Sequence, residues 1–372
     1  MPIFLCYDPK KRSTPWTQIK YQSMVNEFVK QRIKHFSISS VEELEENLKA
    51  HPDETSSIVF FPGSESERKY LFDRYKKFNI HRIVFSHNDV DAAACNFSYV
   101  MSDFYGDMEL AISHLREKGC KRISLFCPNL GSYHDRMRVD TYKSFVGDSA
   151  LIFPTTDKVY PALESLLKCK ERIDAIICIN DFVAFCLMLV LNALDKNWHE
   201  KLLILSFSNS NLSGVCYPSL SSISLNYKDG GREIATIHKA LVKNNRMAYM
   251  RIVMKSQLFA RETTEKEKPS GMVFSSYPAY DYEALKTIVA PQLKCMALEK
   301  LLENSDSTDL AIMHQLCLGS TIDKIALNLS YSRETVKYRI GKLRKILKFP
   351  TTAELSEWLR IWIDPNKLEK MI

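Results

Sequence analysis

The sequence predicts two α/β lobes with parallel sheets, followed by a small domain made only of helices. From residue 3 to about residue 225, short β-branched runs alternate with amphipathic helical patterns, which is typical of parallel sheets covered by helices. The series contains more elements than one ordinary sheet holds, so we expect two lobes. After a change of composition at 261–281, from charge to Ser, Pro and Gly and then to aromatic residues, only helical patterns follow.

The elements of the two lobes follow one another in a regular order. Strands are predicted at the apolar runs "IFLCYD", "HFSIS", "SSIVFFPG", "RIVFS", "FSYVMSD", "RISLFCP", "DAIICIN" and "LLILSFS". Helices between them are predicted near 18–33, 41–49, 66–77, 106–118, 136–146 and 182–195. Each helical pattern is too short to cross a membrane, and the longest apolar run, Val183–Leu191, is shorter still.

The C-terminal region shows a helical pattern at 282–303 and a compact helical group from about residue 306. In "GSTIDKIALNLSYS", Ser320 and Asp323 have the spacing of a capping box, and Ile322, Ile325, Ala326 and Leu329 have the spacing of one helical face. Flanking helices at 308–317 and 352–363 are expected to close the core. Leu355, Trp358 and Trp362 of the last helix suit core packing, and a contact between two tails is the alternative.

The stretch "SRETVKYRIGKLRKIL" at 332–347 predicts a helix with one apolar and one basic face. Ser332 is a suitable N-cap, and the apolar face consists of Val336, Ile340, Leu343 and Leu347. The opposite face and its borders carry charged and polar residues: Glu334, Lys337, Tyr338, Gly341, Lys342, Arg344, Lys345 and Lys348. Two short amphipathic helices joined by a tight turn are typical of a helix-turn-helix, whose second helix enters the DNA major groove.

Composition limits the class of protein. The chain has 372 residues, 45% hydrophobic and 26% charged, with a formal net charge of +7, which favours a local basic patch over a uniformly basic surface. Its ten cysteines are scattered without CxxC spacing, and several lie in apolar runs, so we expect buried, reduced thiols and no zinc site. The N-terminus does not resemble a signal peptide. We therefore expect a soluble, cytoplasmic protein.

The C-terminal helices resemble a known DNA-binding family. "STIDKIALNLSYSRETVKYRIGKLRKIL" is similar to the LuxR-type helix-turn-helix pattern "IA..L..S..TVK.....I..KL", with matches at Leu329, Ser332 and Thr335–Lys337. This resemblance implies that Lys337, Tyr338 and Gly341 approach DNA bases. Because Gly341 offers no side chain, base recognition is expected from Glu334, Lys337 and Tyr338. Backbone phosphates are the expected partners of Lys342, Arg344 and Lys345, and Ser332, Arg333 and Thr335 are further expected DNA contacts.

Several segments of the first 264 residues match the patterns of a second known family. "SDFYGDMELAISHLREKGCKRISLF" is similar to the pattern "D...G...A..HL...GH..I", and "RMRVDTYKSFV" is similar to "R..GF". "DAIICINDFVAFCLMLVLNAL", "ILSFSNS" and "YPSLSSISLNY" follow in the family's order. By these segments the chain resembles the sensor of the LacI/GalR repressors, a two-lobed periplasmic-binding-protein-like (type I) fold. The family's N-terminal DNA-binding segment is missing, and "GFDD" reads "SFSNS", so the ligand chemistry is expected to differ from that of familiar members.

The resemblance implies a small polar ligand, by default a sugar or sugar derivative, in a cleft between the lobes. It makes Asp181 a hydroxyl-binding carboxylate and Arg138 an arginine that holds hydroxyls or a carboxylate, with Arg136 able to exchange roles with it. Tyr227 lies where an aromatic ring commonly stacks on the ligand. Further expected contacts are Asp103, Phe104, Trp16 and Tyr133. The alternatives are ordinary ones: a helix N-cap for Asp181, a solvated arginine for Arg138 and hinge packing for Tyr227.

Two other classes of protein are alternatives to a DNA-binding sensor. An α/β enzyme is disfavoured because the sequence has no GxGxxG after a strand, no GxxxxGK[ST], no GxSxG and no HExxH, and no catalytic, metal-binding or cofactor-binding residues are expected. A sensor whose tail binds another protein is the second alternative. The favoured hypothesis is a one-component transcription regulator that binds double-stranded DNA as a homodimer. Its expected regions are a sensor at 1–262, a linker and connecting helix at 263–304, and a DNA-binding domain at 305–372.

Overall fold

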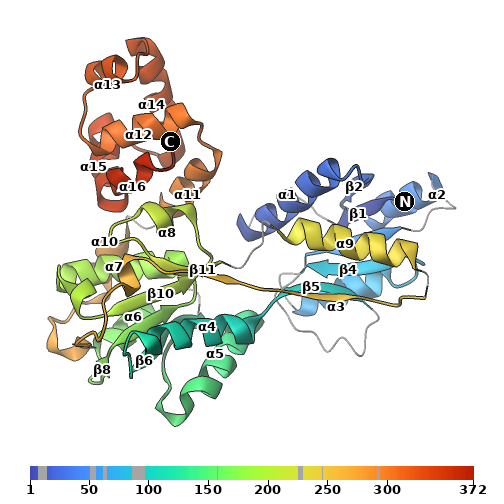
Figure 1. Ribbon diagram of the computed structural model, residues 1–372, viewed down its shortest axis with the longest axis horizontal. Helices are drawn as coiled ribbons and strands as arrows, with labels where there is room; N and C mark the ends of the chain where they lie inside the picture. Colours follow the sequence, from blue (N-terminus) through green and yellow to red (C-terminus); the bar gives the residue numbers. More distant parts are fainter. Residues whose placement is uncertain are drawn as a thin grey trace. The chain divides into compact units, whose positions relative to one another are not determined.

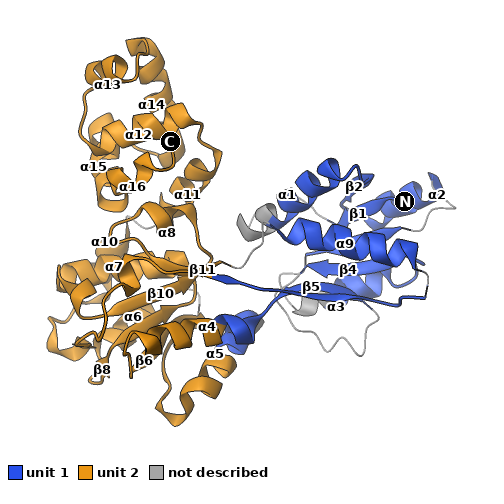
Figure 2. Ribbon diagram, in the orientation of Figure 1, with its two compact units in different colours: residues 1–107, 131–138, 225–257 blue, residues 108–130, 139–224, 258–372 orange. Residues whose placement is uncertain are grey.

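The computed structural model describes the chain except for residues 7–14, 51–55, 62–64, 86–96, 157, 225–228, 245 and 291–293, and it leaves the side chains of 15–19, 65–68 and 133 undescribed. The chain forms two units (Figure 2). Unit 1 contains residues 1–107, 131–138 and 225–257, and unit 2 contains residues 108–130, 139–224 and 258–372. The chain passes between the units at five points rather than through one linker, and each unit contains its own six-stranded sheet, which confirms the prediction of two α/β lobes.

Unit 1 is built on a six-stranded sheet whose strands pair in parallel. Its order is β12 (Arg251–Met254), β5 (Ser98–Ser102), β4 (His81–Phe85), β3 (Ser57–Phe60), β1 (Ile3–Cys6) and β2 (His35–Ile38). The helices are α1 (Pro15–Lys30), α2 (Val41–Ala50), α3 (Glu65–Tyr75) and α9 (Gly230–Lys243). α1 and α9 lie side by side (Figure 1), and a Cβ at Gly231 would lie 2.3 Å from the carbonyl oxygen of Ser23. Only glycine permits this approach.

The α/β part of unit 2, called here the second lobe, contains another six-stranded sheet. Its order is β13 (Gln257–Phe259), β11 (Ser221–Ser224), β10 (Leu203–Phe207), β9 (Ala175–Cys178), β6 (Ile123–Asn129) and β7 (Leu151–Thr155). The helices are α4 (Phe104–Glu117), α5 (Tyr133–Val146), α6 (Tyr160–Leu167), α7 (Asp181–Leu194) and the short α8 (Asn211–Val215). A small antiparallel pair is formed by β8 (Arg172–Ile173) and β14 (Met272–Val273).

The C-terminal part of unit 2, called here the tail, is entirely helical. Its helices are α10 (Tyr282–Val289), α11 (Cys295–Asn304), α12 (Ser307–Cys317), α13 (Ile322–Asn328), α14 (Arg333–Leu347), α15 (Thr352–Trp362) and α16 (Pro365–Glu369). The single helix predicted at 282–303 is wrong, because the segment forms two helices, α10 and α11, and the sequence between them contains Pro291, which has no amide hydrogen with which to continue a helix. The capping box at Ser320 is also wrong, since Thr321 is the N-cap of α13 and accepts a hydrogen bond from the Lys324 amide.

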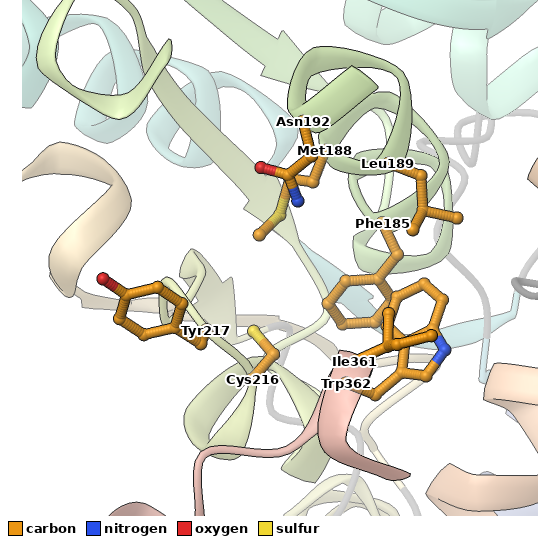
Figure 3. Close-up of a pocket in the computed structure, with 8 residues that line it drawn as sticks. All are labelled: Phe185, Met188, Leu189, Asn192, Cys216, Tyr217, Ile361 and Trp362. Carbon is orange, nitrogen blue, oxygen red and sulfur yellow. The ribbon is translucent and has the colours of Figure 1, made fainter. Parts of the chain in front are cut away.

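The tail and the second lobe share one continuous hydrophobic core. Buried residues of this cluster run from Phe126 in β6 to Leu368 in α16. The ring of Trp362 in α15 packs edge-on against Phe185 of α7, with centroids 5.8 Å apart. Figure 3 shows these two rings beside a small apolar hollow that is also lined by Met188 and Cys216. The burial of Leu355, Trp358 and Trp362 assigns the last large helix to the core rather than to a contact between two tails.

The described cysteines are free, and most are buried, with Cys6 and Cys169 partly exposed. Cys95 lies outside the described residues. Of the helices that the structure describes, none combines the length and the apolar character needed to cross a bilayer.

Candidate functional site

Six side chains from the first turns of α4 and α5 form a group that we call the α4–α5 cluster. These turns follow β5 and β6, so the cluster lies at the carboxyl ends of strands, where open α/β sheets bind ligands. The members belong to unit 1: Asp103, Phe104, Asp107, His134, Asp135 and Arg138. Three of them, Asp103, Phe104 and Arg138, were predicted ligand contacts, and the structure brings these three together.

The guanidinium of Arg138 lies over an aromatic ring inside this cluster. Its Cζ is 5.6 Å from the centroid of the Phe104 ring, and its Nη1 is 3.8 Å from Asp135 Oδ1. The ring of His134 packs edge-on against the same Phe104 ring, with centroids 6.2 Å apart. Burial lowers the pKa of His134 to about 4, with the nearby positive charges of Lys20 and Arg138 as smaller causes, so His134 is neutral at pH 7.

Asp103 closes the N-terminus of α4. Its Oδ1 accepts a hydrogen bond of 2.9 Å from the amide of Gly106. A Cβ at Gly106 would lie 2.5 Å from Asp103 Oδ2, so a larger residue there would displace the carboxylate. The glycine of the sequence motif therefore fixes the position of a predicted ligand contact.

Asp107 is the most unusual member of the cluster. It is 3% exposed, and neither carboxylate oxygen has a hydrogen-bond partner of good geometry among the described residues. Burial raises the pKa of Asp107 to about 6, while the Ser256 hydroxyl and the charge of Arg138 oppose this rise. The cluster thus combines three aspartate side chains with one guanidinium. It suits a ligand that donates hydrogen bonds, such as a polyhydroxyl compound.

Asp181 begins α7 directly after β9, as predicted, but its side chain is 0% exposed. Its Oδ1 accepts hydrogen bonds from the hydroxyls of Ser206 at 2.5 Å and Ser222 at 2.6 Å, and its Oδ2 accepts one of 2.7 Å from the Ser210 amide. Burial raises the pKa of Asp181, and these three bonds partly counter that rise. The helix N-cap is Asn180, not Asp181. Ligand contact by Asp181 stays a prediction.

The other predicted ligand contacts are less well defined by the structure. Arg136 is exposed, and its Nη1 donates a hydrogen bond of 3.2 Å to the carbonyl oxygen of Gly131. Trp16 lies in α1 and Tyr133 begins α5, but both side chains are outside the described set. Tyr227 lies outside the described residues altogether.

In the tail, α13 and α14 form the predicted helix pair, and α14 separates its two faces cleanly. Val336, Ile340, Leu343 and Leu347 are buried, as predicted. We call the exposed face the α14 surface, which consists of Glu334, Lys337, Tyr338, Gly341, Lys342 and Lys345. Tyr338 is 76% exposed, and a Cβ at Gly341 would meet nothing within 4 Å. In Figure 1 α14 and α13 lie at the end of the tail remote from α8.

The start of α14 is fixed by its cap. Ser332 Oγ accepts a hydrogen bond of 3.1 Å from the amide of Thr335, and the two hydroxyls lie 2.8 Å apart. Glu334 in the first turn and Arg344 and Lys345 in the last turn match the helix dipole. Ser332 and Thr335, which were both predicted to contact DNA, therefore bond to each other and fix the first turn of the helix.

The basic residues of α14 differ in their partners. Arg339 bonds Asp306 at 2.9 Å and Asp309 at 2.7 Å, so it ties α14 to α12. Two further ion pairs are exposed and therefore weak: Arg333 with Asp323 at 2.8 Å and Lys337 with Glu334 at 3.3 Å. Lys342 is itself exposed, but its Nζ lies 3.6 Å from the buried carboxylate of Asp309. Arg344 is partly buried and donates to the carbonyl oxygen of Phe349, whereas Lys345 forms no ion pair within the described part of the chain.

Sequence reasoning did not identify Asp107 and Asp135 as members of a site. Asp107 lies inside the matched segment "SDFYGDMELA", one turn after Asp103, and this helical spacing was the available signal. No group of His, Cys, Asp and Glu side chains suited to a metal ion is present where the structure describes them.

Comparison with known proteins supports the fold of the two lobes. Residues 112–264 match a periplasmic binding protein-like domain. The chain is similar in structure to a LacI family transcriptional regulator from Enterococcus faecalis V583 with bound ribose, at 17% identity and a TM-score of 0.53, covering 70% of this chain and 97% of that one. A regulator from Enterococcus faecium, also with bound ribose, has 18% identity, a TM-score of 0.53 and coverage of 70% and 97%.

A third solved structure, a putative transcriptional regulator LacI from Bacillus cereus subsp. cytotoxis NVH 391-98, has 17% identity and a TM-score of 0.54, covering 72% of this chain and 99% of that one. Comparison with curated protein sequences gave no match. The structural matches cover the length of the two lobes, so they establish a periplasmic-binding-protein-like fold in front of the helical tail.

Proposed function

We propose that this protein is a one-component transcription regulator, which senses a small polar molecule between its α/β lobes and binds double-stranded DNA through its tail. The observation that carries this proposal is the exposed α14 surface, in which Lys337, Tyr338 and Lys345 project from a helix whose other face is buried. A convex helix of this kind, preceded by a short helix and a tight turn, suits the major groove.

The fold of the lobes supports the sensing half of the proposal. Solved LacI-family regulators of similar structure carry bound ribose. The α4–α5 cluster offers three carboxylates, a stacked guanidinium and an aromatic ring, which are groups suited to hydroxyls and sugar faces. A sugar or sugar derivative is therefore the proposed ligand, held by Arg138, Asp103, Phe104 and Asp107.

The resemblance of the tail to LuxR-type domains supports the part of the proposal that concerns DNA binding. In this proposal Lys337, Tyr338 and Glu334 contact bases, and Lys342 and Lys345 contact phosphates. A homodimer would place two α14 helices one DNA turn apart, about 34 Å, on a palindromic site. We also assign the protein to the cytoplasm, where its DNA target lies.

The test joins a selection experiment with a ligand screen. The full-length protein is used to select binding sites from random double-stranded DNA, and affinity is then measured against salt. Enrichment of a palindromic sequence, with affinity that falls steeply with salt, is expected. In parallel, a thermal-shift screen of pentoses, hexoses, sugar acids and polyols tests the lobes, since a ligand at about a hundredfold its Kd adds about 2.7 kcal/mol of stability.

A tail that binds another protein is the second candidate, and one observation favours it. Leu327 of α13 is 79% exposed, and Tyr331 beside it is 42% exposed, so the tail carries apolar groups on its surface near the turn. No sequence enrichment, together with weak dependence of partner binding on salt, would support this candidate over DNA binding.

A further inference from the structure

The first turn of α8 is held by carboxylates from two different parts of unit 2. The Ser210 amide donates to Asp181 Oδ2 of the second lobe at 2.7 Å. The next two amides, of Asn211 and Leu212, donate to Oε1 and Oε2 of Glu299 in the tail at 2.7 and 2.8 Å. We call Asp181 and its three hydrogen-bond donors, Ser206, Ser210 and Ser222, the Asp181 network. Of three consecutive backbone N–H groups, one therefore bonds to this network and two bond to Glu299 of α11.

Glu299 is well fixed in this position. Its Oε1 also accepts a hydrogen bond of 3.0 Å from the side-chain amide of Asn211. The amide bonds lower the pKa of Glu299, but burial outweighs them, and the nearby charges of Glu303 and Asp181 raise it further, so the pKa is raised overall. Two carboxylates thus face the same helical turn closely enough for their charges to interact, one in each part of the unit.

The tail also holds the C-terminal end of α8. The carbonyl oxygen of Val215 accepts a hydrogen bond of 2.7 Å from the amide of Asp364, and that of Cys216 accepts one of 3.2 Å from Lys367 Nζ. Lys367 additionally pairs with Glu262 of the second lobe. Both ends of this short helix, which lies beside α11 in Figure 1, are therefore bonded to the tail, so a displacement of α8 has a direct path to the tail.

The loop that leads from β10 into α8 has a strained backbone. Ser208 has a φ of +124° and Asn209 a φ of +48°, positive values that residues with a Cβ adopt uncommonly. Hydrogen bonds hold the loop in this form, including one of 2.9 Å from the Asn209 amide to Ser222 Oγ and one of 2.6 Å from Arg261 Nη2 to Asn209 Oδ1. Since Ser222 also donates to Asp181, loosening the Asp181 network releases the loop.

We infer that α8 couples the two functional ends of the protein: a change in the Asp181 network shifts the first turn of α8, and Glu299 carries that shift into the tail. In this role Glu299 is a positioning residue that touches neither ligand nor DNA. The inference rests on the proposed function, because it explains how a ligand at the strand ends would alter the placement of α14. A displacement at this rigid turn has a bonded path to the tail, whereas a flexible linker would absorb it.

The test is hydrogen–deuterium exchange of the full-length protein, which needs neither the ligand nor DNA. Glu299→Gln keeps the size of the side chain but replaces one acceptor oxygen by a donor facing an amide. Amide exchange in peptides covering 205–217 is expected to accelerate by at least about tenfold, corresponding to about 1.4 kcal/mol. The matched control is Glu303→Gln, at an exposed glutamate one turn along α11 that accepts none of the α8 amide bonds described above, so exchange at 205–217 should change far less than in Glu299→Gln.

A second measurement tests whether a change at Asp181 reaches the tail, as coupling requires, or stays within α8. Asp181→Asn should accelerate exchange in the peptide covering 295–304, although none of the Asp181 hydrogen bonds described above reaches that segment. In the double variant Asp181→Asn with Glu299→Gln, the loss of protection should differ from the product of the two single losses by at least about threefold. Unchanged exchange at 295–304, or single losses that simply multiply, would overturn the inference.

Two reserve variants keep the test open if a carboxylate variant does not fold. Ser222→Ala removes one donor to Asp181, and Lys367→Met releases the other end of α8, with the exposed Lys370→Met as its control. Failure of the wild type to bind DNA would contradict the proposed function and leave the exchange result intact. Absence of exchange coupling, in a protein that binds DNA and sugar, would overturn this inference alone.

Discussion

The α4–α5 cluster buries its charged side chains, whereas the α14 surface displays them to solvent. In the cluster, Asp107 is 3% exposed and its carboxylate has no hydrogen-bond partner of good geometry among the residues that the structure describes, and Arg138 is 9% exposed with its guanidinium over the Phe104 ring. On α14 the lysine side chains are exposed; Lys337 forms a weak exposed pair with Glu334, and Lys342 lies 3.6 Å from Asp309. Burying an unsatisfied carboxylate costs free energy in the unliganded protein, while an exposed lysine costs almost nothing until its partner arrives.

This difference teaches where each site obtains its selectivity. A buried group that lacks a donor rewards the one ligand that supplies it, so the cluster is expected to discriminate between closely related small molecules. An exposed basic helix attracts any DNA by its charge, and its preference must come from the few groups that reach base edges. The two ends of the molecule should therefore respond in opposite ways to mutation.

The largest expected effect is at Asp181. Asp181→Ala leaves the hydroxyls of Ser206 and Ser222 and the amide of Ser210 without their acceptor, so the free energy of unfolding should fall by about 3 kcal/mol or more. Urea denaturation measures it. Asp181→Asn, which keeps one acceptor oxygen, is the control and should lose less. A loss below about 1 kcal/mol in the alanine variant would remove the structural role argued here and favour a side chain reserved for ligand.

The second-largest expected effect is at Asp107, where a substitution should increase the free energy of unfolding. Because burial raises the pKa of Asp107 from 3.8 to about 6, the native state binds the proton more tightly than the unfolded state, and the ionised carboxylate destabilises the fold above pH 6. Asp107→Asn should therefore raise the free energy of unfolding by about 2 kcal/mol at pH 7. This gain should shrink as the pH falls from 6 to 4, where the wild-type carboxyl is protonated in the folded protein.

Asp140→Asn serves as the matched control for Asp107, since Asp140 is an exposed aspartate on α5. It should change stability by less than about 0.5 kcal/mol at every pH. Equal behaviour of the two variants would show that Asp107 is solvated in solution, and the contrast between the buried and the exposed site would then fail.

A smaller effect should divide the lysines of α14. Lys337→Ala should lose about 1–2 kcal/mol of affinity for a selected operator but little for random DNA, because base contacts carry the preference. Lys345→Ala should weaken both DNAs equally and reduce the slope of log affinity against log salt by about 0.9. Fluorescence anisotropy at several salt concentrations measures both. Identical profiles for the two variants would contradict this division.

The smallest effect concerns Gly341. An added methyl group would meet nothing within 4 Å, so Gly341→Ala should stabilise the helix by about 0.5–1 kcal/mol, detectable as a higher thermal midpoint. If the α14 backbone approaches bases closely at this position, the same variant should bind operator DNA more weakly. Stronger or unchanged binding would show that Gly341 lies away from the DNA.

How much the sequence predicted depends on how local each feature is. The two lobes, the helix pair of the tail and the buried face of α14 were predicted correctly, because strand alternation and helical periodicity are read within one segment. The break in the helix predicted at 282–303 was also available from Pro291, which was overlooked. The cap of α13 at Thr321 rather than Ser320 is an error of one residue, typical of helix ends.

The hydrogen-bond partners of the candidate site residues could not be predicted from local sequence patterns. Asp181 was recognised from its place after a strand, but its satisfaction by Ser206, Ser210 and Ser222 depends on two neighbouring strand ends and a loop. The Glu299 cap joins residues 87 and 88 positions apart, and no local pattern marks it. Exposure of α14 could be read from periodicity, whereas the burial of Asp107 required the packing of α4 against other elements.

The continuous core between the tail and the second lobe has a consequence for protein engineering. A tail transplanted onto a different receptor would carry Trp362 and Leu368 to a surface that lacks Phe185 and α8 to cover them. Conversely, a receptor stripped of its tail would present Phe185 and Met188 to water. Chimeras of this molecule therefore need their junction inside the second lobe, so that α7, α8 and the tail are exchanged as one cassette.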